Sequence, residues 1–193
     1  VVAMHSYGHD ALINSFFLKR SLRQLGTDHI DIMLLGYYSW KPSPQVIRGA
    51  MKLKEKGLVK HIGMTGHNRK LIAELAGEGV LDVFHVRYNA VHRGAEHDVF
   101  PTLGMENRPG IVSFTATNWG QLLDPKRMPE GEKPLTAGDC YRFALSNPAV
   151  DVCLTGPKTL EQMRENLNSL ELGPLDEDEM ARIRKIGDYI YSR

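Results

Sequence analysis

The chain has 193 residues, with 24 Lys and Arg against 23 Asp and Glu, so its formal net charge at pH 7 is +1. A charge this balanced gives no reason to expect binding to nucleic acid or to an anionic membrane, and no apolar run approaches the roughly 20 residues of a membrane span. Cys140 and Cys153 have no second thiol at metal-ligand spacing. We therefore expect reduced thiols and a cytoplasmic protein.

The chain begins inside an apolar run, VVAM, which predicts a strand over residues 1–4. A start in mid-strand leads us to expect that residues are missing before Val1. A polar loop is expected over residues 5–9, and Asp10 is placed to cap a helix that Gly26 ends. The apolar face expected for that helix consists of Leu12, Phe16, Leu18, Leu22 and Leu25.

Strands and helices then alternate along the chain. Further strands are expected at residues 30–35, 60–64, 81–86, 110–115 and 149–154. Further helices are expected at residues 43–56, 68–76, 139–145, 159–167 and 174–190. Alternation of this kind implies parallel strands joined by crossovers, and no GxGxxG motif supports a dinucleotide-binding doubly wound sheet. The pattern predicts a TIM (β/α)8-type barrel with about six βα units and a C-terminal helix, as one N-terminally incomplete domain over residues 1–193.

The segment 151–167, DVCLTGPKTLEQMRENL, carries a candidate anion site. Residues 152–154 form an apolar run typical of a buried parallel strand, and a glycine turn follows. Thr159 is placed as a helix N-cap, with Gln162 three residues later. The turn would leave backbone N–H groups free at one spot, where Lys158 adds a positive charge and favours an anion. An ordinary βα turn with a surface lysine is an equally good interpretation of this segment alone.

Four segments together resemble the aldo-keto reductase superfamily. They are SLRQLGTDHIDIMLLG (21–36), GLVKHIGMTGHN (57–68), GIVSFTATNWGQLL (110–123) and FALSNPAVDVCLTGPKTLEQMRENL (143–167). The match covers nearly the whole chain in the right order, and the last segment is the most specific. The resemblance implies an NADP(H)-dependent oxidoreductase that acts on a small-molecule carbonyl, with its site at the carboxyl ends of the barrel strands.

The resemblance also implies which residues hold the coenzyme. Thr65 and His85 stand at the two positions that hold the nicotinamide carboxamide. The loop over the pyrophosphate contains Thr117, Trp119, Gly120 and Leu122. The adenosine end contains Gly156, Lys158, Thr159, Gln162, Glu165 and Asn166. Lys158 beside a helix N-terminus suits a phosphate monoester, which favours NADP over NAD.

The proton-donating residues of the family are absent or changed. Its tyrosine and aspartate belong to the first two βα units, which this chain lacks. Met4 or His5 stands where the family has a lysine, Gly36 replaces a histidine, and Gly66 takes the place of an asparagine. The aromatic residue that stacks on the nicotinamide falls near Ala116. We expect His5, at a site-facing strand end, to act as the replacement acid, the alternative being a histidine that is hydrogen-bonded in a loop.

Other functions remain open at this stage. A catalytically silent barrel could keep the NADP(H) site as a sensor or interaction module, and a phosphate-binding lyase or isomerase has only fold analogy in its favour. The histidines at 85, 92 and 97 match no tight metal-ligand spacing. Open strand edges in an incomplete barrel invite a partner, so we expect either an oligomer or pairing with a missing N-terminal segment.

Overall fold

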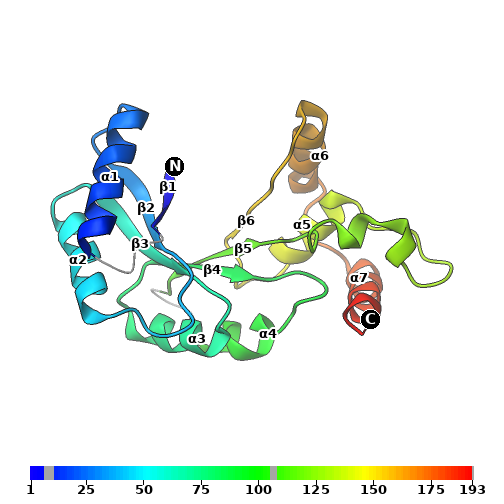
Figure 1. The fold of residues 1–193 in the computed structure, drawn as a ribbon. Helices are drawn as coiled ribbons and strands as arrows, with labels where there is room; N and C mark the ends of the chain where they lie inside the picture. Colours follow the sequence, from blue (N-terminus) through cyan, green and yellow to red (C-terminus); the bar gives the residue numbers. More distant parts are fainter. Residues whose placement is uncertain (7–10, 105–107, 193) are drawn as a thin grey trace. The chain divides into compact units, whose positions relative to one another are not determined.

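The computed structural model describes residues 1–6, 11–104 and 108–192, with only the backbone described for residues 11–13. The chain forms two compact units. Unit 1 comprises residues 1–85 and 101–110, and unit 2 comprises residues 86–100 and 111–193. Figure 1 shows strands and helices alternating along the chain. Among the described helices, none is both long enough and apolar enough to cross a membrane.

Unit 1 is a parallel sheet whose strands follow chain order. Its strands are β1 (Ala3–Ser6), β2 (Ile30–Leu35), β3 (Val59–Thr65) and the first part of β4 (Val83–Arg87). The helices between them are α1 (Ala11–Leu25), α2 (Pro44–Glu55) and α3 (Arg69–Glu78). Met33 lies between Met4 and Ile62 in the register, and Met64 lies beside Phe84. Continuous apolar strands such as β2 are what a sheet covered on both faces requires.

Local signals in the sequence set the ends of the unit 1 helices. The Ser43 hydroxyl accepts a hydrogen bond from the Val46 N–H at 3.4 Å, and Asn68 Oδ1 accepts one from the Leu71 N–H at 3.2 Å. Gly57, with φ at 71°, takes the left-handed conformation that ends the α2 segment before β3. The expected starts of α2 and α3 are confirmed within a residue.

Unit 2 contains a second set of parallel strands and helices. Its elements are α4 (Ala95–Asp98), β5 (Gly110–Phe114), α5 (Ala137–Leu145), β6 (Val152–Cys153), α6 (Leu160–Glu171) and α7 (Glu177–Tyr191). The first residue of β5, Gly110, is assigned to unit 1. Single 3-10 turns occupy Gln121–Leu123 and Pro125–Arg127, and a third, Phe100–Thr102, lies at the boundary of the units. β5 pairs in parallel with β6. Capping boxes begin α5 and α7.

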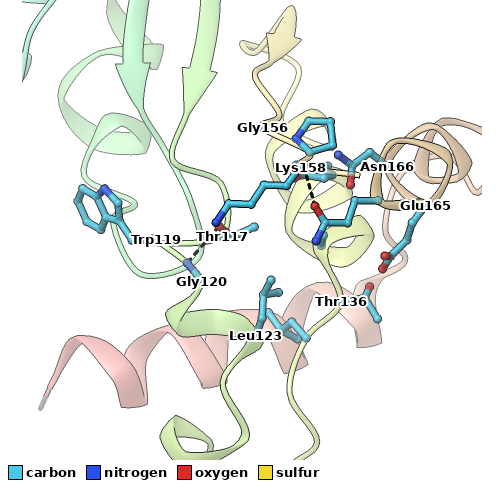
Figure 2. A pocket seen from close by; sticks show the side chains of 14 residues that line it. Thr117, Trp119, Gly120, Leu123, Thr136, Gly156, Lys158, Glu165 and Asn166 are labelled. Carbon is cyan, nitrogen blue, oxygen red and sulfur yellow. Dashed lines mark hydrogen bonds between the residues drawn. The ribbon is translucent and has the colours of Figure 1, made fainter. Parts of the chain in front are cut away.

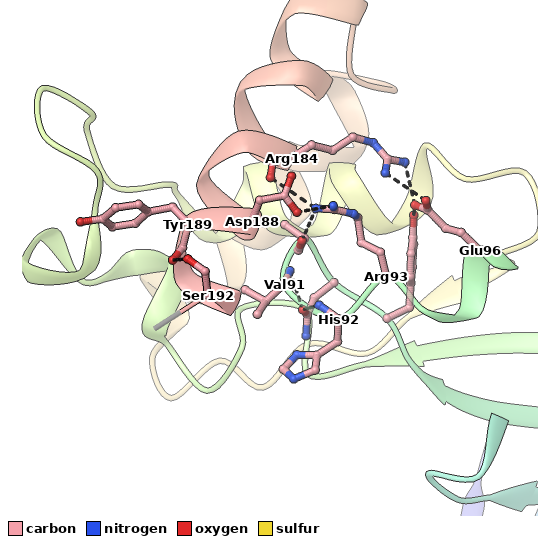
Figure 3. Close-up of polar contacts among 11 residues, drawn as sticks. Val91, His92, Arg93, Glu96, Arg184, Asp188, Tyr189 and Ser192 are labelled. Atoms are coloured by element: carbon pink, nitrogen blue, oxygen red, sulfur yellow. Dashed lines mark hydrogen bonds and ion pairs between the residues drawn. The ribbon is translucent and has the colours of Figure 1, made fainter. Parts of the chain in front are cut away.

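A polar network fixes α7 on the segment after β4. The buried Tyr88 ring lies 5.5 Å from the Phe143 ring, and its hydroxyl donates to Glu96 at 2.6 Å. Arg184 of α7 donates two hydrogen bonds to the same carboxylate, at 2.7 and 2.9 Å, and Arg93 pairs with Asp188 (Figure 3). The charges of this network satisfy one another, so α7 is held by more than apolar contact.

The last expected strand is mostly wrong. Only Val152–Cys153 forms β6, and the run is not buried, because Val152 and Leu154 are 48% and 44% exposed. β6 stands at one end of the strand order and pairs with β5 alone among the described strands. Within the expected strand, Val150 is buried, whereas Val152 and Leu154 lie on a side that the described structure leaves about half exposed.

The first expected elements also need correction. β1 runs from Ala3 to Ser6, so His5 belongs to a strand and not to a loop, since its backbone pairs with β2. On α1, Leu18 and Leu22 are buried as expected, whereas Phe16 and Leu25 are 60% and 55% exposed, because the core contacts only one side of the helix. The expected cap at Asp10, residues 7–9 and the Leu12 side chain lie outside the described residues.

Candidate functional site

A pocket in unit 2 collects most of the residues that the sequence assigns to a coenzyme. Its volume is about 860 Å³, and it lies between the loop after β5, the start of α5 and the N-terminus of α6 (Figure 2). The predicted residues in its wall are Thr117, Trp119, Gly120, Gly156, Lys158, Gln162, Glu165 and Asn166. Leu122 is instead fully buried, which makes it a support for the loop rather than a contact surface.

The N-terminus of α6 is less open than the sequence suggests. Thr159 caps the helix by accepting a hydrogen bond from the Gln162 N–H at 3.2 Å. The Gln162 side-chain oxygen in turn accepts from the Lys158 N–H at 2.7 Å. The expectation that these N–H groups are free is therefore wrong for Lys158 and Gln162, because the capping side chains occupy them. The N–H groups of Leu160 and Glu161, in the first helical turn, have no intrahelical acceptor and still favour an anion.

Among the residues that line the pocket, Lys158 carries a positive charge and Glu165 carries a negative charge. The Lys158 side chain extends across the pocket in the direction of Thr117 (Figure 2). A mobile ammonium group beside a helix N-terminus can neutralise a phosphate without a fixed geometry. The carboxylate of Glu165 lies on the α6 wall, so the two charges divide the pocket into a basic and an acidic part.

The loop after β5 has an unusual backbone. Thr115, Asn118 and Trp119 have φ values of 62°, 50° and 54°, and Gly120 follows at 84°. Left-handed residues other than glycine are uncommon and gather at ligand sites, where the surrounding structure must hold them. Here the Gly120 N–H donates to the Thr117 hydroxyl at 3.3 Å, which closes the turn at the edge of the pocket.

The side chain of Asn89 holds this loop, a role that no pattern in the sequence indicates. Asn89 is fully buried, and its amide donates to the Thr115 carbonyl at 2.8 Å. Its carbonyl oxygen accepts from the N–H groups of Val91 and His92 at 3.0 and 2.8 Å. An asparagine after a predicted strand is too common a signal to identify such a role. The α5 wall of the pocket, which includes Thr136 and Tyr141, was missed as well, because its approach to the α6 segment is a tertiary contact that no local pattern reveals.

Trp119 stands between the pocket and a smaller cavity of about 340 Å³. Its ring is exposed and has the Arg87 guanidinium 6.0 Å from its centre. The His92 ring meets it edge-on, with ring centres 6.3 Å apart. Trp119 is therefore a surface ring held by cation–π and aromatic contacts rather than a core residue, and the part of the ring that these contacts leave exposed can stack on a ligand.

The other predicted site residues lie in unit 1. Thr65 and His85 are buried and occupy paired positions at the carboxyl ends of β3 and β4. The His5 ring lies edge-on to the His85 ring, with centres 5.9 Å apart. Burial, and then the charge of His5, lowers the pKa of His85 to about 4, and burial lowers the pKa of His5. Both rings are therefore mainly neutral at pH 7, which gives each one donor and one acceptor nitrogen.

The fold and the site define a class: a parallel βα protein whose polar side chains lie at the carboxyl ends of the strands and in the loops that lead into the helices. Within each unit, neighbouring strands are also neighbours along the chain, as in a (β/α) barrel. The pocket of about 860 Å³ combines a lysine, a helix N-terminus and a left-handed loop, which suits a phosphorylated ligand. Among the described residues, no group of three or more His, Cys, Asp or Glu is arranged to hold a metal ion.

The chain belongs to the aldo/keto reductase family, whose model matches residues 4–136 and 131–188. It is 25% identical over 198 residues to the NADH-specific methylglyoxal reductase of Escherichia coli strain K12, an alignment that covers 82% of this chain and 59% of that protein. The chain thus spans less than two thirds of the length of this relative.

Solved structures agree on the fold. The aldo-keto reductase AKR11C1 from Bacillus halodurans superposes with TM-scores of 0.79 in its holo form and 0.77 in its apo form. Both forms are 19% identical to this chain. The match with the holo form covers 96% of this chain and 71% of the solved chain, and the match with the apo form covers 95% and 70%. The expected family and the (β/α)8-type fold class are confirmed, with six parallel strands in the described residues.

Proposed function

We propose that this chain is the coenzyme-binding part of an NADP(H)-dependent oxidoreductase that interconverts a small-molecule carbonyl and an alcohol. Membership of the aldo/keto reductase family supports oxidoreductase chemistry. The single observation that carries the coenzyme assignment is the position of Lys158 at the N-terminus of α6, in the wall of a pocket of about 860 Å³. A cytoplasmic location is part of this proposal, because both cysteines are free thiols.

The chemistry of the pocket fits the adenosine end of the coenzyme. Lys158 and the first-turn N–H groups of α6 would hold the 2′-phosphate, which carries the charge that distinguishes NADP from NAD. Glu165 and Asn166 line the same pocket and offer acceptors and a donor for an adenine edge. The turn from Thr117 to Gly120, which is left-handed at its last three residues, would follow the pyrophosphate, and Trp119 would cover one side. The E. coli relative is named as NADH-specific, so the choice of coenzyme is the point to test.

Thr65 and His85 would hold the nicotinamide carboxamide. They are paired across β3 and β4, and the neutral His85 ring can donate and accept at once, as a carboxamide requires. When bound, the coenzyme supplies or accepts the hydride. His5 would exchange the accompanying proton, and because burial lowers its pKa, the ring is mainly in the neutral form at pH 7, which is the form that accepts a proton in alcohol oxidation.

Calorimetry with NADPH and NADH tests the coenzyme assignment directly. Changing Lys158→Met keeps much of the side chain and removes its charge. Loss of a charge-assisted contact of about 1.5–3 kcal/mol should raise the dissociation constant for NADPH roughly 10- to 150-fold. Affinity for NADH should change little. The matched control is Arg164→Met, which removes an exposed cation from α6 that is not among the lining residues.

Two results would contradict the assignment: no heat with either coenzyme, or an equal loss of NADPH and NADH affinity in the Lys158 variant. Turnover is measured separately, from the absorbance of the reduced nicotinamide in the presence of a panel of carbonyl compounds. His5→Ala should lower that rate by about 10²-fold or more if His5 exchanges the proton. Coenzyme binding with no turnover on any carbonyl would identify the chain as a binding module instead.

A further inference from the structure

Residues 124–135, which we call the connecting segment, join the loop after β5 to α5 and belong to the frame of the proposed coenzyme pocket. Leu123 and Thr136, which flank the segment, line the pocket, and so does Leu135. The Leu135 N–H donates to the Leu122 carbonyl at 3.1 Å, which holds the two ends of the segment together. A displacement of the connecting segment would therefore move part of the pocket wall.

The middle of the connecting segment is attached to α7 by polar contacts. Glu132 Oε2 accepts a hydrogen bond from Arg182 Nε at 3.1 Å, and Glu132 Oε1 accepts one from Lys185 Nζ at 3.4 Å. Arg182 also donates through Nη2 to the Lys133 carbonyl at 2.8 Å. The planar guanidinium thus binds a side chain and a backbone group of the segment at once. We call these three contacts the Glu132 tether.

The Glu132 tether is better placed than an ordinary surface ion pair. The Glu132 side chain is only 21% exposed and meets two cations, of which Arg182 is 39% exposed. Single exposed ion pairs contribute little to stability, whereas several charges in a network contribute more. None of residues 129–134 is buried, and the buried apolar side chains Met128 and Leu135 lie on either side of them. The middle of the segment therefore depends on the tether for its position.

Helix α7 offers the tether a fixed anchor. Ile186 of α7 is fully buried. Arg184 binds the Glu96 carboxylate, and Asp188 pairs with Arg93 (Figure 3). These contacts hold α7 independently of the connecting segment, so the tether transmits the position of α7 to the segment.

We propose that Glu132 is a positioning residue for the coenzyme, because it fixes the connecting segment on α7 and thereby preorganises the pocket wall. This inference rests on the coenzyme site proposed above, and it adds a residue that does not itself line the pocket. A wall that is ordered before binding saves the entropy of ordering it during binding, which raises affinity. Leu123 and Leu135 cannot recognise the charge of a 2′-phosphate, so loss of the tether weakens NADPH and NADH alike.

Calorimetry with both coenzymes tests the positioning role. Glu132→Gln keeps the shape of the side chain and removes its charge, and we expect it to raise both dissociation constants about fivefold. The matched control is Glu130→Gln, which makes the same change in charge at an exposed position of the same segment and should not weaken binding. Removal of a negative charge would by itself strengthen the binding of an anionic coenzyme. Weaker binding by Glu132→Gln therefore reports the lost tether and not the altered net charge.

A second variant tests whether Glu132 acts through α7. Arg182→Met removes the other side of the tether and should also weaken both coenzymes. If the two residues act together, Glu132→Gln should have a smaller effect in the Arg182→Met background than in the wild type. Arg182→Met also serves on its own if circular dichroism shows that Glu132→Gln does not fold. Effects that simply add would overturn the proposal that the two residues form one tether.

Hydrogen exchange of residues 128–135 measures the tether without any coenzyme. Exchange should be faster in Glu132→Gln than in the wild type and unchanged in Glu130→Gln, and NADPH should slow it in the wild type because the coupling is reciprocal. Coenzyme binding that Glu132→Gln leaves unchanged, or exchange that it leaves unchanged, would overturn this inference alone. A wild type that binds neither coenzyme would overturn the proposed function and this inference together.

Discussion

Replacing Arg142 should loosen the framework behind the proposed coenzyme pocket. The Arg142 guanidinium donates two hydrogen bonds of 2.7 Å to the Glu179 carboxylate. It also donates to the carbonyls of Gly173 and Pro174 at 2.9 and 3.1 Å. It thereby ties α5, which forms one wall of the pocket, to the segment between α6 and α7. Its side chain is 9% exposed, and that of Glu179 is 40% exposed.

The structure sets the size of the effect. Removing one partner of a buried ion pair costs about 3–5 kcal/mol, and the half-exposed Glu179 can regain water, which places Arg142→Met near 3 kcal/mol. For a chain of this length, this corresponds to a fall in melting temperature of about 6–12 °C. The melting temperature of Arg142→Lys should lie between those of the wild type and Arg142→Met, because an ammonium group cannot reach all four acceptors together.

Thermal unfolding followed by circular dichroism measures this loss. Arg164→Met, which removes an exposed arginine from α6, should change the stability by less than about 0.5 kcal/mol. The NADPH affinity of Arg142→Met should also fall, although Arg142 does not line the pocket. A melting temperature for Arg142→Met within about 2 °C of the wild type, a shift worth under 1 kcal/mol, would refute this reasoning.

Three further changes have expected outcomes in the same assays. The lowered pKa of His85, about 4 against 6.5, means that stability from this residue is complete above pH 6.5 and is lost as the pH falls toward 4. Between pH 8 and pH 5, the wild type should therefore lose about 2 kcal/mol more unfolding free energy than His85→Gln, and equal losses would contradict this. Asn89→Ala removes three buried hydrogen bonds and should cost about 3 kcal/mol in urea unfolding, with a loss below 1 kcal/mol counting against the assigned role. In Gly187→Ala, the new Cβ would lie 2.1 Å from the Ala90 carbonyl oxygen and should destabilise by about 2 kcal/mol or more, whereas Gly77→Ala, in open space on α3, should be neutral or stabilising.

The sequence by itself determined the features that depend on neighbouring residues. Helix caps at Ser43, Asn68 and Thr159 act over three residues, and apolar runs such as Ile30–Leu35 carry the strand signal within themselves. The order of strands and helices, together with four recognisable segments, was enough for the family and the fold class. Eight coenzyme positions inferred from the resemblance also line a single pocket, although their role stays a prediction.

The tertiary structure decided what depends on residues far apart in the chain. Asn89 holds a loop 26 positions away, and Arg142 reaches Glu179 across 37 positions, so no local pattern could reveal either role. The sequence placed apolar residues on α6 correctly at helical spacing but could not say which side of the helix meets the core. Burial is a property of the assembled neighbours, and in the described structure those neighbours cover Asn166 and Ser169 instead of the leucines.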